Sequence, residues 1–447
     1  MIKVITYGTY DLLHYGHIRL LERAKSLGDY LIVGVTADDF DKTRGKINVQ
    51  QSLIERIEAV RATGLADEII IEEYEGQKID DIKRYDVDIF TVGSDWKGHF
   101  DYLNEYCKVV YLDRTQGVSS TELRSEQNKI RFGLVGTSSV IQKYMKELEY
   151  VNGTELIGIF NDTGTSIPEE LERFYFSGTY EQFLDTVDAV FIRSMPENHY
   201  SLIKTALEKK VHVLCESPLS ISCMEFEELQ KIAQNNKCIL MEAQKTAYST
   251  AYYRMQLLVK SGIIGDVISI DSTCTSLLDF DLKDEEKLKL QWNSITAWGP
   301  TAMLPVFQIL GTSFKSRQIV SKIINDKYLF DSFTKISFIY DNAVASIKVG
   351  KGIKSEGELI ISGTKGYVYV PAPWWKTDYF EVRFENSSDN KRYFYQLDGE
   401  GIRYELVAFF KSINFEKDIG YVAKDVSFAE IKIIEDFYIN RNISRIC

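Results

Sequence analysis

Short apolar runs alternate with helical patterns through the first 112 residues of the chain. A strand that is followed by a helix and then by another strand is typical of parallel β-sheets, because parallel neighbours need a long crossover connection. We therefore predict an α/β fold whose first parallel sheet contains the strands Ile2–Tyr7, Leu31–Thr36, Glu68–Ile71, Ile89–Val92 and Val109–Leu112.

A second strand-turn-helix pattern begins after the polar stretch from Arg124 to Lys129. Its apolar run, Ile130–Val135, is followed by Gly136 and a helical pattern, which is the order at the start of a dinucleotide-binding fold. A chain of 447 residues is also too long for one ordinary domain, so we expect two or three. We place the first boundary near residue 129, which gives a first domain of residues 1–128.

The composition is that of a globular protein, with 45% apolar and 26% charged residues. No apolar stretch approaches the roughly 18 residues of a membrane-spanning helix, and the start of the chain lacks the pattern of a secretion signal. The six cysteines are scattered, which favours reduced thiols. We therefore expect a cytoplasmic protein without membrane insertion. The formal net charge of −12 argues against a nucleic-acid partner, because such proteins need a basic face.

Two of the five histidines, His14 and His17, lie three residues apart directly after the first predicted strand. Gly8 ends that strand and a helical pattern begins at Ile18, so the pair falls at a helix N-terminus, where phosphate binds. Gly16 would let the backbone approach a triphosphate, and both rings can donate N–H groups to phosphate oxygens. A His-x-x-His pair can arise by chance, but its place between a strand and a helix resembles a nucleotidyltransferase signature.

A second motif, Arg114 to Thr121, follows the run Val109–Leu112. With the first motif and the segments Val92–Trp96 and Phe100–Leu103, it resembles the glycerol-3-phosphate cytidylyltransferases of teichoic-acid synthesis over the first 128 or so residues. The resemblance implies that a polyol phosphate attacks CTP, that pyrophosphate leaves, and that Mg²⁺ helps to neutralise the phosphates. Glycerol-3-phosphate is the usual acceptor in that family, although ribitol phosphate or another polyol phosphate stays open.

The same resemblance implies roles for individual residues. The catalytic ones are His14, His17 and Arg114, and no metal-ligating residue is assigned. The assignment of a phosphate-binding role to Lys46 is weaker, because its spacing to Arg56 differs by one residue from that in the family. Arg44 could take this role instead, or either residue could be a solvated loop charge. Ser120 stands where the family usually has threonine, and its hydroxyl keeps the donor. The residues expected to bind nucleotide or substrate are Gly8, Thr9, Asp11, Gly16, Lys46, Asp95, Thr115, Ser119, Ser120 and Thr121.

The second module has a poor glycine fingerprint. Gly136 is the first glycine of a Gly-x-Gly-x-x-Gly pattern, but Ser138 and Ile141 occupy the other two places. After the predicted strand Leu156–Phe160, the position that binds ribose in such folds holds Asn161, and Asp162 follows it. This acidic residue keeps NAD(P) as a candidate cofactor.

Further motifs extend this pattern toward the end of the chain. The segments Asp188–Ile192, Met195–His199 and Val211–Leu219 resemble the Gfo/Idh/MocA oxidoreductases, over residues 130 to 447. The resemblance implies a Rossmann dinucleotide-binding-like domain at 130–245 and an α+β domain with a largely antiparallel sheet at 246–447. Alternating apolar residues in Val267–Ser276 and Lys335–Tyr340 fit such a sheet. The residues expected near the cofactor are Gly136, Ser138, Asp162, His199 and Glu216, although His199 could instead be a capping or buried histidine.

Departures from the oxidoreductase pattern affect its chemistry. Ser217 stands where the family has the lysine that hydrogen-bonds the reacting hydroxyl. Thr301 stands where it has the catalytic His or Tyr, and Ala297 where it has an acid. Hydride transfer to a carbonyl needs a proton donor, for which Lys245 is the weak remaining candidate.

Three functions stay open. We favour a cytidylyltransferase with a degenerate oxidoreductase-like domain that binds, regulates or oligomerises. The alternative is a bifunctional enzyme whose second part reduces a keto-sugar phosphate to the polyol phosphate that the first part activates; a nucleotide-binding scaffold without activity is the third. The product would feed a cell-surface polymer such as teichoic acid or capsule, and we expect a homodimer because members of both families self-associate.

Overall fold

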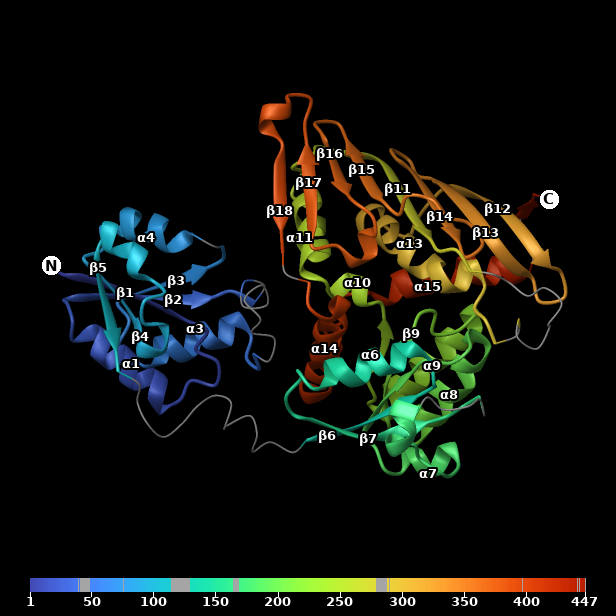
Figure 1. Cartoon of the computed structure of the whole chain (residues 1–447), viewed down its shortest axis with the longest axis horizontal. Helices are drawn as coiled ribbons and strands as arrows, with labels where there is room; N and C mark the ends of the chain where they lie inside the picture. Colours follow the sequence, from blue (N-terminus) through green and yellow to red (C-terminus); the bar gives the residue numbers. More distant parts are fainter. Residues whose placement is uncertain are drawn as a thin grey trace. The chain divides into compact units, whose positions relative to one another are not determined.

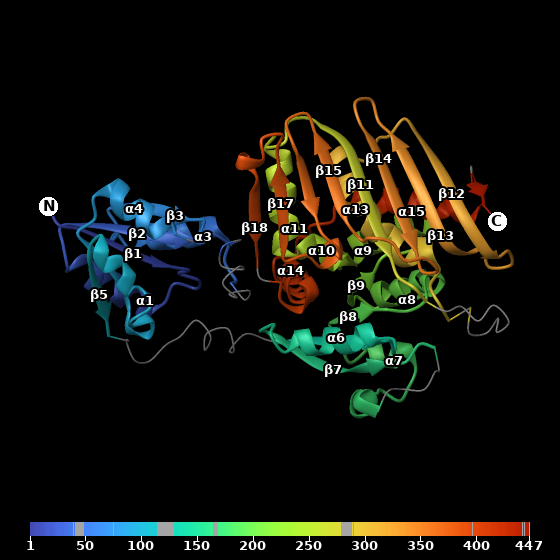
Figure 2. The same ribbon diagram turned by 45° about the horizontal axis from the view of Figure 1, so that its top comes forward.

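The computed structural model divides into two compact units, residues 1–129 and 130–447, which are described separately (Figures 1 and 2). It describes residues 1–38, 40, 49–74, 76–113, 129–163, 169–278, 288, 290–395, 397–439, 441 and 443–446. Among these residues, no helix is long and apolar enough to cross a membrane.

The first unit contains a five-stranded parallel sheet in the order β3-β2-β1-β4-β5. Its strands are β1 (Lys3–Gly8), β2 (Tyr30–Thr36), β3 (Glu68–Glu72), β4 (Ile89–Gly93) and β5 (Lys108–Leu112), each within one residue of its prediction at either end. The helices include α1 (Tyr15–Lys25), α3 (Leu53–Ala62) and α4 (Gln77–Tyr85).

Helices cover both faces of this sheet. Successive side chains of a strand point to opposite faces, so neighbouring residues of β1 pack in different cores. Val4 packs in one core with Leu21 of α1 and Val60 of α3. The next residue, Ile5, packs in the other core with Ile82 of α4. The predicted α/β class is confirmed, and the carboxyl ends of the strands are left to carry loops.

The second unit begins with another five-stranded parallel sheet, in the order β10-β9-β8-β6-β7. Its strands are β6 (Ile130–Val135), β7 (Thr154–Phe160), β8 (Ala189–Ile192), β9 (His212–Glu216) and β10 (Leu240–Ala243). Its helices include α6 (Ser139–Leu148), α7 (Tyr180–Leu184), α8 (Pro196–Glu208) and α9 (Cys223–Asn236). The strand order reverses beside β6, which is where ligands bind in open α/β sheets.

A nine-stranded, largely antiparallel sheet follows in the order β18-β17-β16-β15-β11-β14-β13-β12-β19. The pairs β11–β14 and β12–β19 are parallel. Its strands are β11 (Val267–Thr275), β12 (Ser316–Asn325), β13 (Phe330–Ile339), β14 (Val344–Gly350), β15 (Leu359–Gly363), β16 (Tyr367–Val370), β17 (Tyr379–Arg383), β18 (Lys391–Phe394) and β19 (Ile443–Arg445). The helices after β10 include α10 (Lys245–Tyr248), α11 (Thr250–Lys260), α13 (Ser294–Leu310), α14 (Ile402–Asn414) and α15 (Lys424–Tyr438).

The last two helices of the chain pack onto the parallel-sheet half of the second unit. Phe410 of α14 packs edge-on against Phe132 of β6, with ring centroids 5.1 Å apart. Ile431 of α15 belongs to the core of the parallel sheet, while α15 also packs against α13 beside the large sheet. Segments late in the sequence therefore help to build the parallel-sheet half of this unit.

Candidate functional site

The loop after β1 is held in an unusual backbone conformation. Tyr10 and Leu12 both have positive φ angles, 53° and 46°, which non-glycine residues rarely adopt. The ring of Tyr10 is buried beneath the loop, and a Cβ atom on Gly8 would lie only 3.0 Å from it. Such strain persists only where the surroundings enforce it, and it concentrates at functional sites. Gly8 is thus required for the packing of Tyr10 at the end of β1.

His14 and His17 face each other at the start of α1. Their rings are stacked, with centroids 3.9 Å apart. His14 is the N-cap of α1, and its Nδ1 accepts the backbone N–H of Gly16 over 3.1 Å. Because Nδ1 accepts, the ring proton of neutral His14 is on Nε2. The amide of Gly16 is used for this cap, so its N–H belongs to the helix start, and Nε2 of His14 is the donor that the ring can offer to a phosphate.

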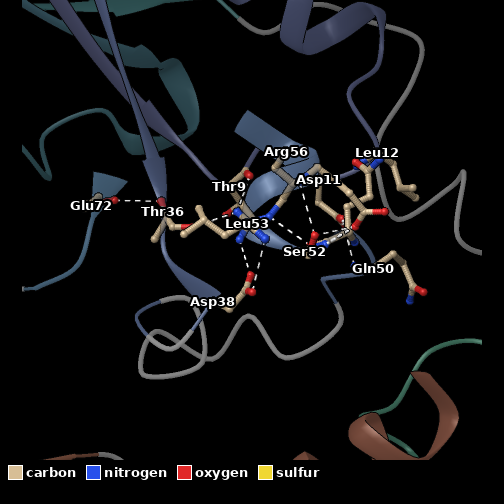
Figure 3. A network of polar contacts seen from close by, with 12 residues as sticks. Thr9, Asp11, Leu12, Thr36, Asp38, Gln50, Ser52, Leu53, Arg56 and Glu72 are labelled. Atoms are coloured by element: carbon tan, nitrogen blue, oxygen red, sulfur yellow. Dashed lines mark hydrogen bonds and ion pairs between the residues drawn. The ribbon is translucent and has the colours of Figure 1, made fainter. Parts of the chain in front are cut away.

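Asp11 holds the segment just before α3 against this loop (Figure 3). Its Oδ1 accepts the backbone N–H groups of Gln50 and Gln51, each over 2.9 Å. Gln51 returns the contact through its side-chain oxygen, which accepts the N–H of Leu12 over 2.7 Å. Asp11 therefore positions the residues that lead into α3 beside the His14 loop.

Arg56 of α3 is the central residue of the network in Figure 3. Its side chain has no exposed surface, and Nη1 donates to the carbonyl oxygens of Thr9 (2.7 Å) and Thr36 (2.8 Å). Nη2 pairs with Asp38, and the hydroxyl of Thr36 donates to Glu72. Arg56 thus ties the ends of β1 and β2 together. Sequence reasoning assigned it no role, although it lies one helical turn before buried Val60 and so on the inward face of α3.

A second charged residue lies at the same end of the sheet. Lys78 of α4 forms an ion pair with buried Glu72, and its ammonium lies 4.7 Å from the ring centre of Tyr7. Both lysine and glutamate line a cavity of about 70 Å³ that also reaches Gly8 and Trp96. Nothing in the spacing of Lys78 marked it as a candidate, because only the fold places α4 beside the end of β1.

The structure thus brings Gly8, Thr9, Asp11, His14, Gly16 and His17 together at the end of β1. Asp95 is exposed on the short helix η1 (Ser94–Trp96) that follows β4. The expected residues Lys46, Arg114, Thr115, Ser119, Ser120 and Thr121, and the alternative Arg44, lie outside the described residues.

In the second unit, Gly136 ends β6 with a φ of 121°. A Cβ atom there would lie 2.2 Å from the carbonyl oxygen of Arg193, just after β8. Ser138 is the N-cap of α6. Glycine is thus needed at 136 for the approach of these two strand ends, and Ser138 stands at the helix start.

Asp162 lines a cavity of about 470 Å³ beside these strand ends. Its Oδ2 accepts the hydroxyl of Ser194, whereas its Oδ1 is buried without a hydrogen-bond partner among the described residues. Burial raises the pKa of this carboxyl, against the hydrogen bond from Ser194. The cavity is also lined by Thr163, Met195, Pro196, Glu197, Asn198, Leu288, Leu290, Gln291, Trp292, Asn293, Thr296, Tyr328, Phe330 and Tyr438.

His199 is completely buried in α8. Nδ1 lies 2.7 Å from the carbonyl oxygen of Pro218, and Nε2 lies 3.2 Å from that of Ser194. Burial lowers its pKa to about 4, so the ring is neutral near pH 7. This geometry fits the alternative of a buried histidine that ties two loops together.

Glu216 lies at the end of β9, where its carboxylate is 3.9 Å from Nε of Arg193. The guanidinium of Arg193 stacks on Trp292, 3.9 Å from the ring centre, and the indole N–H donates to the carbonyl of Ser194. Trp292 comes from the segment before α13, so the large-sheet half supplies a wall beside the end of β8. Sequence reasoning gave it no role.

The departures in the oxidoreductase pattern lie in this region. The hydroxyl of Ser217 donates to Glu242 over 2.7 Å, and both side chains are buried. Thr301 and Ala297 lie one turn apart on α13. Lys245, the weak candidate donor, is paired with Glu400.

Residues 5–157 match a family model described as cytidylyltransferase-like. A glycerol-3-phosphate cytidylyltransferase of Bacillus spizizenii is 51% identical over 126 residues, which are 28% of this chain and 97% of that protein. The chain belongs to the glycerol-3-phosphate cytidylyltransferase family. A Staphylococcus aureus member is 47% identical over 130 residues, 28% of this chain and 95% of that protein. This cytidylyltransferase unit makes the chain a nucleotidyltransferase.

Residues 130–244 match a model described as an oxidoreductase family with an NAD-binding Rossmann fold, the Gfo/Idh/MocA family. One similar structure is KijD10, a 3-ketoreductase from Actinomadura kijaniata in complex with NADP and TDP-benzene. It is 16% identical with a TM-score of 0.62, over 72% of this chain and all of that chain. UDP-N-acetylglucosamine 3-dehydrogenase GnnA from Acidithiobacillus ferrooxidans is 15% identical with a TM-score of 0.58, over 71% and 99%. At these identities the likeness shows the fold.

Proposed function

We propose that the first unit transfers the cytidylyl group of CTP to a polyol phosphate, with glycerol-3-phosphate as the acceptor and CDP-glycerol as the product. The stacked His14–His17 pair at the N-terminus of α1 carries this proposal. The relatives named for this acceptor support it.

In the proposed reaction, an oxygen of the acceptor phosphate attacks the α-phosphorus of CTP. The bond from that phosphorus to the bridging oxygen of the β-phosphate breaks, and pyrophosphate leaves with the electron pair. Catalysis then consists of holding the groups in line and stabilising negative charge. Nε2 of His14, the ring of His17 and the dipole of α1 would act on the triphosphate.

Arg114, Thr115, Ser119, Ser120, Thr121 and Lys46 would add phosphate donors. Among the described residues, no group of three or more His, Cys, Asp or Glu side chains is arranged to hold a metal ion. We therefore propose that Mg²⁺ is bound through the triphosphate, where it would neutralise charge. Lys78 and its small cavity beside Gly8 are our candidate for the acceptor side.

The test is pyrophosphate release with CTP and Mg²⁺ across a panel of glycerol-3-phosphate, ribitol phosphate and other polyol phosphates. We expect the highest kcat/KM with glycerol-3-phosphate. If only another polyol phosphate gives release, the proposed reaction stands but glycerol-3-phosphate is not the acceptor. If no polyol phosphate gives release, the proposal is wrong.

A second candidate function is favoured by Asp162. Its buried Oδ1 lines the larger cavity without a partner, which fits a carboxylate that accepts a ribose hydroxyl of a dinucleotide. With NAD(P)H bound there, supplying hydride, the second unit would reduce a keto-sugar phosphate to the polyol phosphate used by the first. The second unit lacks the family's usual proton-handling residues, because their positions hold Ser217, Thr301 and Ala297. We therefore place this candidate second.

The second candidate predicts NADH oxidation with keto-sugar phosphates. A carboxylate repels the 2′-phosphate of NADPH, so NADH should be preferred. Asp162→Asn should weaken NADH binding without changing cytidylyl transfer from CTP to a supplied polyol phosphate. If neither dinucleotide binds the wild-type chain, this candidate is wrong and the second unit has a non-redox role.

We also propose that the product supplies a cell-surface polymer such as teichoic acid or capsule, and that the chain works as a homodimer. Light scattering of the full chain tests the dimer. A mass of one chain over the working concentration range would contradict it.

A further inference from the structure

Three lysines surround one carboxylate in the second unit. Glu400, in the short helix η6 (Gly399–Gly401), accepts from Lys143 of α6 at 2.9 and 3.0 Å. Lys245 of α10 lies 2.5 Å from Oε2, and Lys376 of η4 (Trp374–Lys376) lies 2.7 Å from Oε1. The three ammonium groups come from three separate elements and converge on a space the size of one anionic group.

The positive charge of the three lysines exceeds the negative charge of Glu400. Burial would raise the pKa of Glu400, but hydrogen bonds from Lys245, Lys376 and Lys143 outweigh burial and hold that pKa far below its usual value. The three lysines therefore keep two positive charges in excess of Glu400. Arg403 is paired with two carboxylates, Glu147 and Asp398, which leave one negative charge over. The whole group of charges therefore has a net charge of +1 while Glu400 is in place.

The chain is bent to place Glu400 there. Its φ is 55°, between Gly399 at 57° and Gly401 at 91°. A Cβ atom at 401 would lie 2.4 Å from the carbonyl oxygen of Lys245, and one at 399 would collide with the Glu147 carboxylate. Two glycines and a left-handed glutamate thus bring a carboxylate to the lysines on a short turn rather than on a regular element.

The cluster is accessible and lies beside the strand ends. Between 28% and 43% of each lysine side chain is exposed, and 29% of that of Glu400. Lys245 comes two residues after the end of β10. Burial raises the pKa of Glu216, while the positive charges of Arg193 and Lys245 act against this shift. The lysines are therefore near the end of β9, on the edge of the parallel sheet where ligands of such folds bind.

We infer that Lys143, Lys245 and Lys376 form a binding site for a phosphate monoester, and that Glu400 occupies this site when the ligand is absent. A phosphate monoester carries close to two negative charges and three terminal oxygens. With Glu400 displaced, the three lysines and the group of Arg403, Glu147 and Asp398 carry a net charge of +2, so both the charge and the three donors match the ligand. Its identity as the phosphate of a keto-sugar substrate rests on the second proposed function. The phosphate displaces the carboxylate, and the glycine-flanked turn is the part that moves.

The first test is calorimetric titration of the full chain, with saturating CTP and Mg²⁺ to fill the first unit. Inorganic phosphate and dihydroxyacetone phosphate are the two probes. Glu400→Gln should bind the phosphate ester about tenfold more tightly, because the competing charge is gone, and Lys245→Met with Lys376→Met should bind it at least about tenfold more weakly. Lys391→Met, which removes an exposed lysine of β18, is the matched control and should change nothing.

Equal affinity in the wild-type chain, Glu400→Gln and the double lysine variant would overturn the site. A gain of affinity in Glu400→Gln cannot come from misfolding, so this variant keeps the test decisive if the lysine variants fold poorly. Inorganic phosphate binding as tightly as the ester, with both responding to the substitutions, would support the anion site and identify free phosphate as its ligand.

The reductase assay separates this inference from the function on which its ligand rests. If no dinucleotide is oxidised but Glu400→Gln still tightens phosphate binding, the reductase proposal fails and the anion site stands. If a keto-sugar phosphate is reduced with the same KM by the wild-type chain and by Lys245→Met/Lys376→Met, the site is not used by the substrate and the inference is wrong.

Discussion

The guanidinium of Arg56, which has no exposed surface, donates to the carbonyl oxygen of Thr9 over 2.7 Å. This contact joins α3 to the loop that leads from β1 to the His14–His17 pair. The same guanidinium reaches Thr36 at the end of β2, so one side chain sets the spacing between two strand ends. The geometry of the loop that carries the His14–His17 pair therefore depends on a residue well outside it.

Arg56→Met should lower the free energy of unfolding of the first unit by about 3 kcal/mol, since buried carbonyl oxygens lose their donor. Arg56→Lys should recover part of this, because an ammonium can reach one or two of the acceptors but cannot copy the planar fork. Denaturant unfolding measures the free energy of unfolding of both variants, and pyrophosphate release measures their activity. Arg61→Met, at an exposed position of the same helix, is the control; a similar loss there would remove the special role of Arg56.

His14→Ala and His17→Ala should each lower kcat for pyrophosphate release by about two to three orders of magnitude, because we propose that each ring donates to developing charge. His14→Asn is the sharper variant. Its Oδ1 can still accept the Gly16 amide and cap α1, while the donor at Nε2 is lost. We expect full stability and low activity, with exposed His99→Ala unchanged in both; an active His14→Asn enzyme would show that the ring serves the cap alone.

Asp11→Asn should keep most of the activity, because an amide oxygen can still accept the N–H groups of Gln50 and Gln51. Asp11→Ala should raise the KM for CTP by about tenfold or more, since both N–H groups lose their acceptor and the loop loosens. Steady-state kinetics on the two variants separates positioning from charge. If Asp11→Asn loses as much as Asp11→Ala, the negative charge itself acts on the bound nucleotide.

The pH dependence of the second unit should reflect Glu405 of α14. Burial raises the pKa of this carboxyl to about 8, against the hydrogen bond from Tyr144. The folded-state pKa lies above the unfolded one, so this contribution to stability is complete below about pH 4.5 and is lost as the pH rises through about 8. Glu405→Gln keeps an acceptor for Tyr144 without the titration.

We expect the free energy of unfolding of Glu405→Gln, relative to the wild-type chain, to grow by about 3 kcal/mol between pH 4.5 and pH 7.5. Urea unfolding of the two proteins across this range measures the difference. Taking the difference removes the opposite effect of His199, whose lowered pKa destabilises the fold as the pH falls from about 6.5 towards 4. A pH-independent difference would contradict a neutral buried Glu405.

The order of elements was predictable to a large extent because it depends on local patterns. The strands β1 to β5 were found within one residue at either end, and β6 was predicted with its observed bounds. Apolar periodicity reports which backbone segments are buried, and a strand buried on both faces has a strong signal of this kind. The His-x-Gly-His motif could be recognised for the same reason, since its histidines and the start of its helix are adjacent in sequence.

Contacts between distant segments were not readable. Lys143, Lys245, Lys376 and Glu400 are spread over some 250 positions, and none has a local pattern that points to the others. Trp292 reaches Ser194 from the segment before α13, and Arg56 reaches Thr9 from α3. Each of these contacts depends on how helices and strands pack. The spacing of residues along the sequence does not show this packing.

The sequence by itself determined the fold class and the presence of a nucleotidyltransferase motif at a helix N-terminus. Backbone conformation and burial follow from hydrophobic periodicity and glycine placement, which are properties of neighbouring residues. Only the tertiary structure decided that Nδ1 of His14 caps α1, that Asp11 braces the loop, and that His199 is buried between carbonyls. It also placed three lysines from separate elements around Glu400, because charges far apart in the chain interact only once packing brings them within a few ångströms.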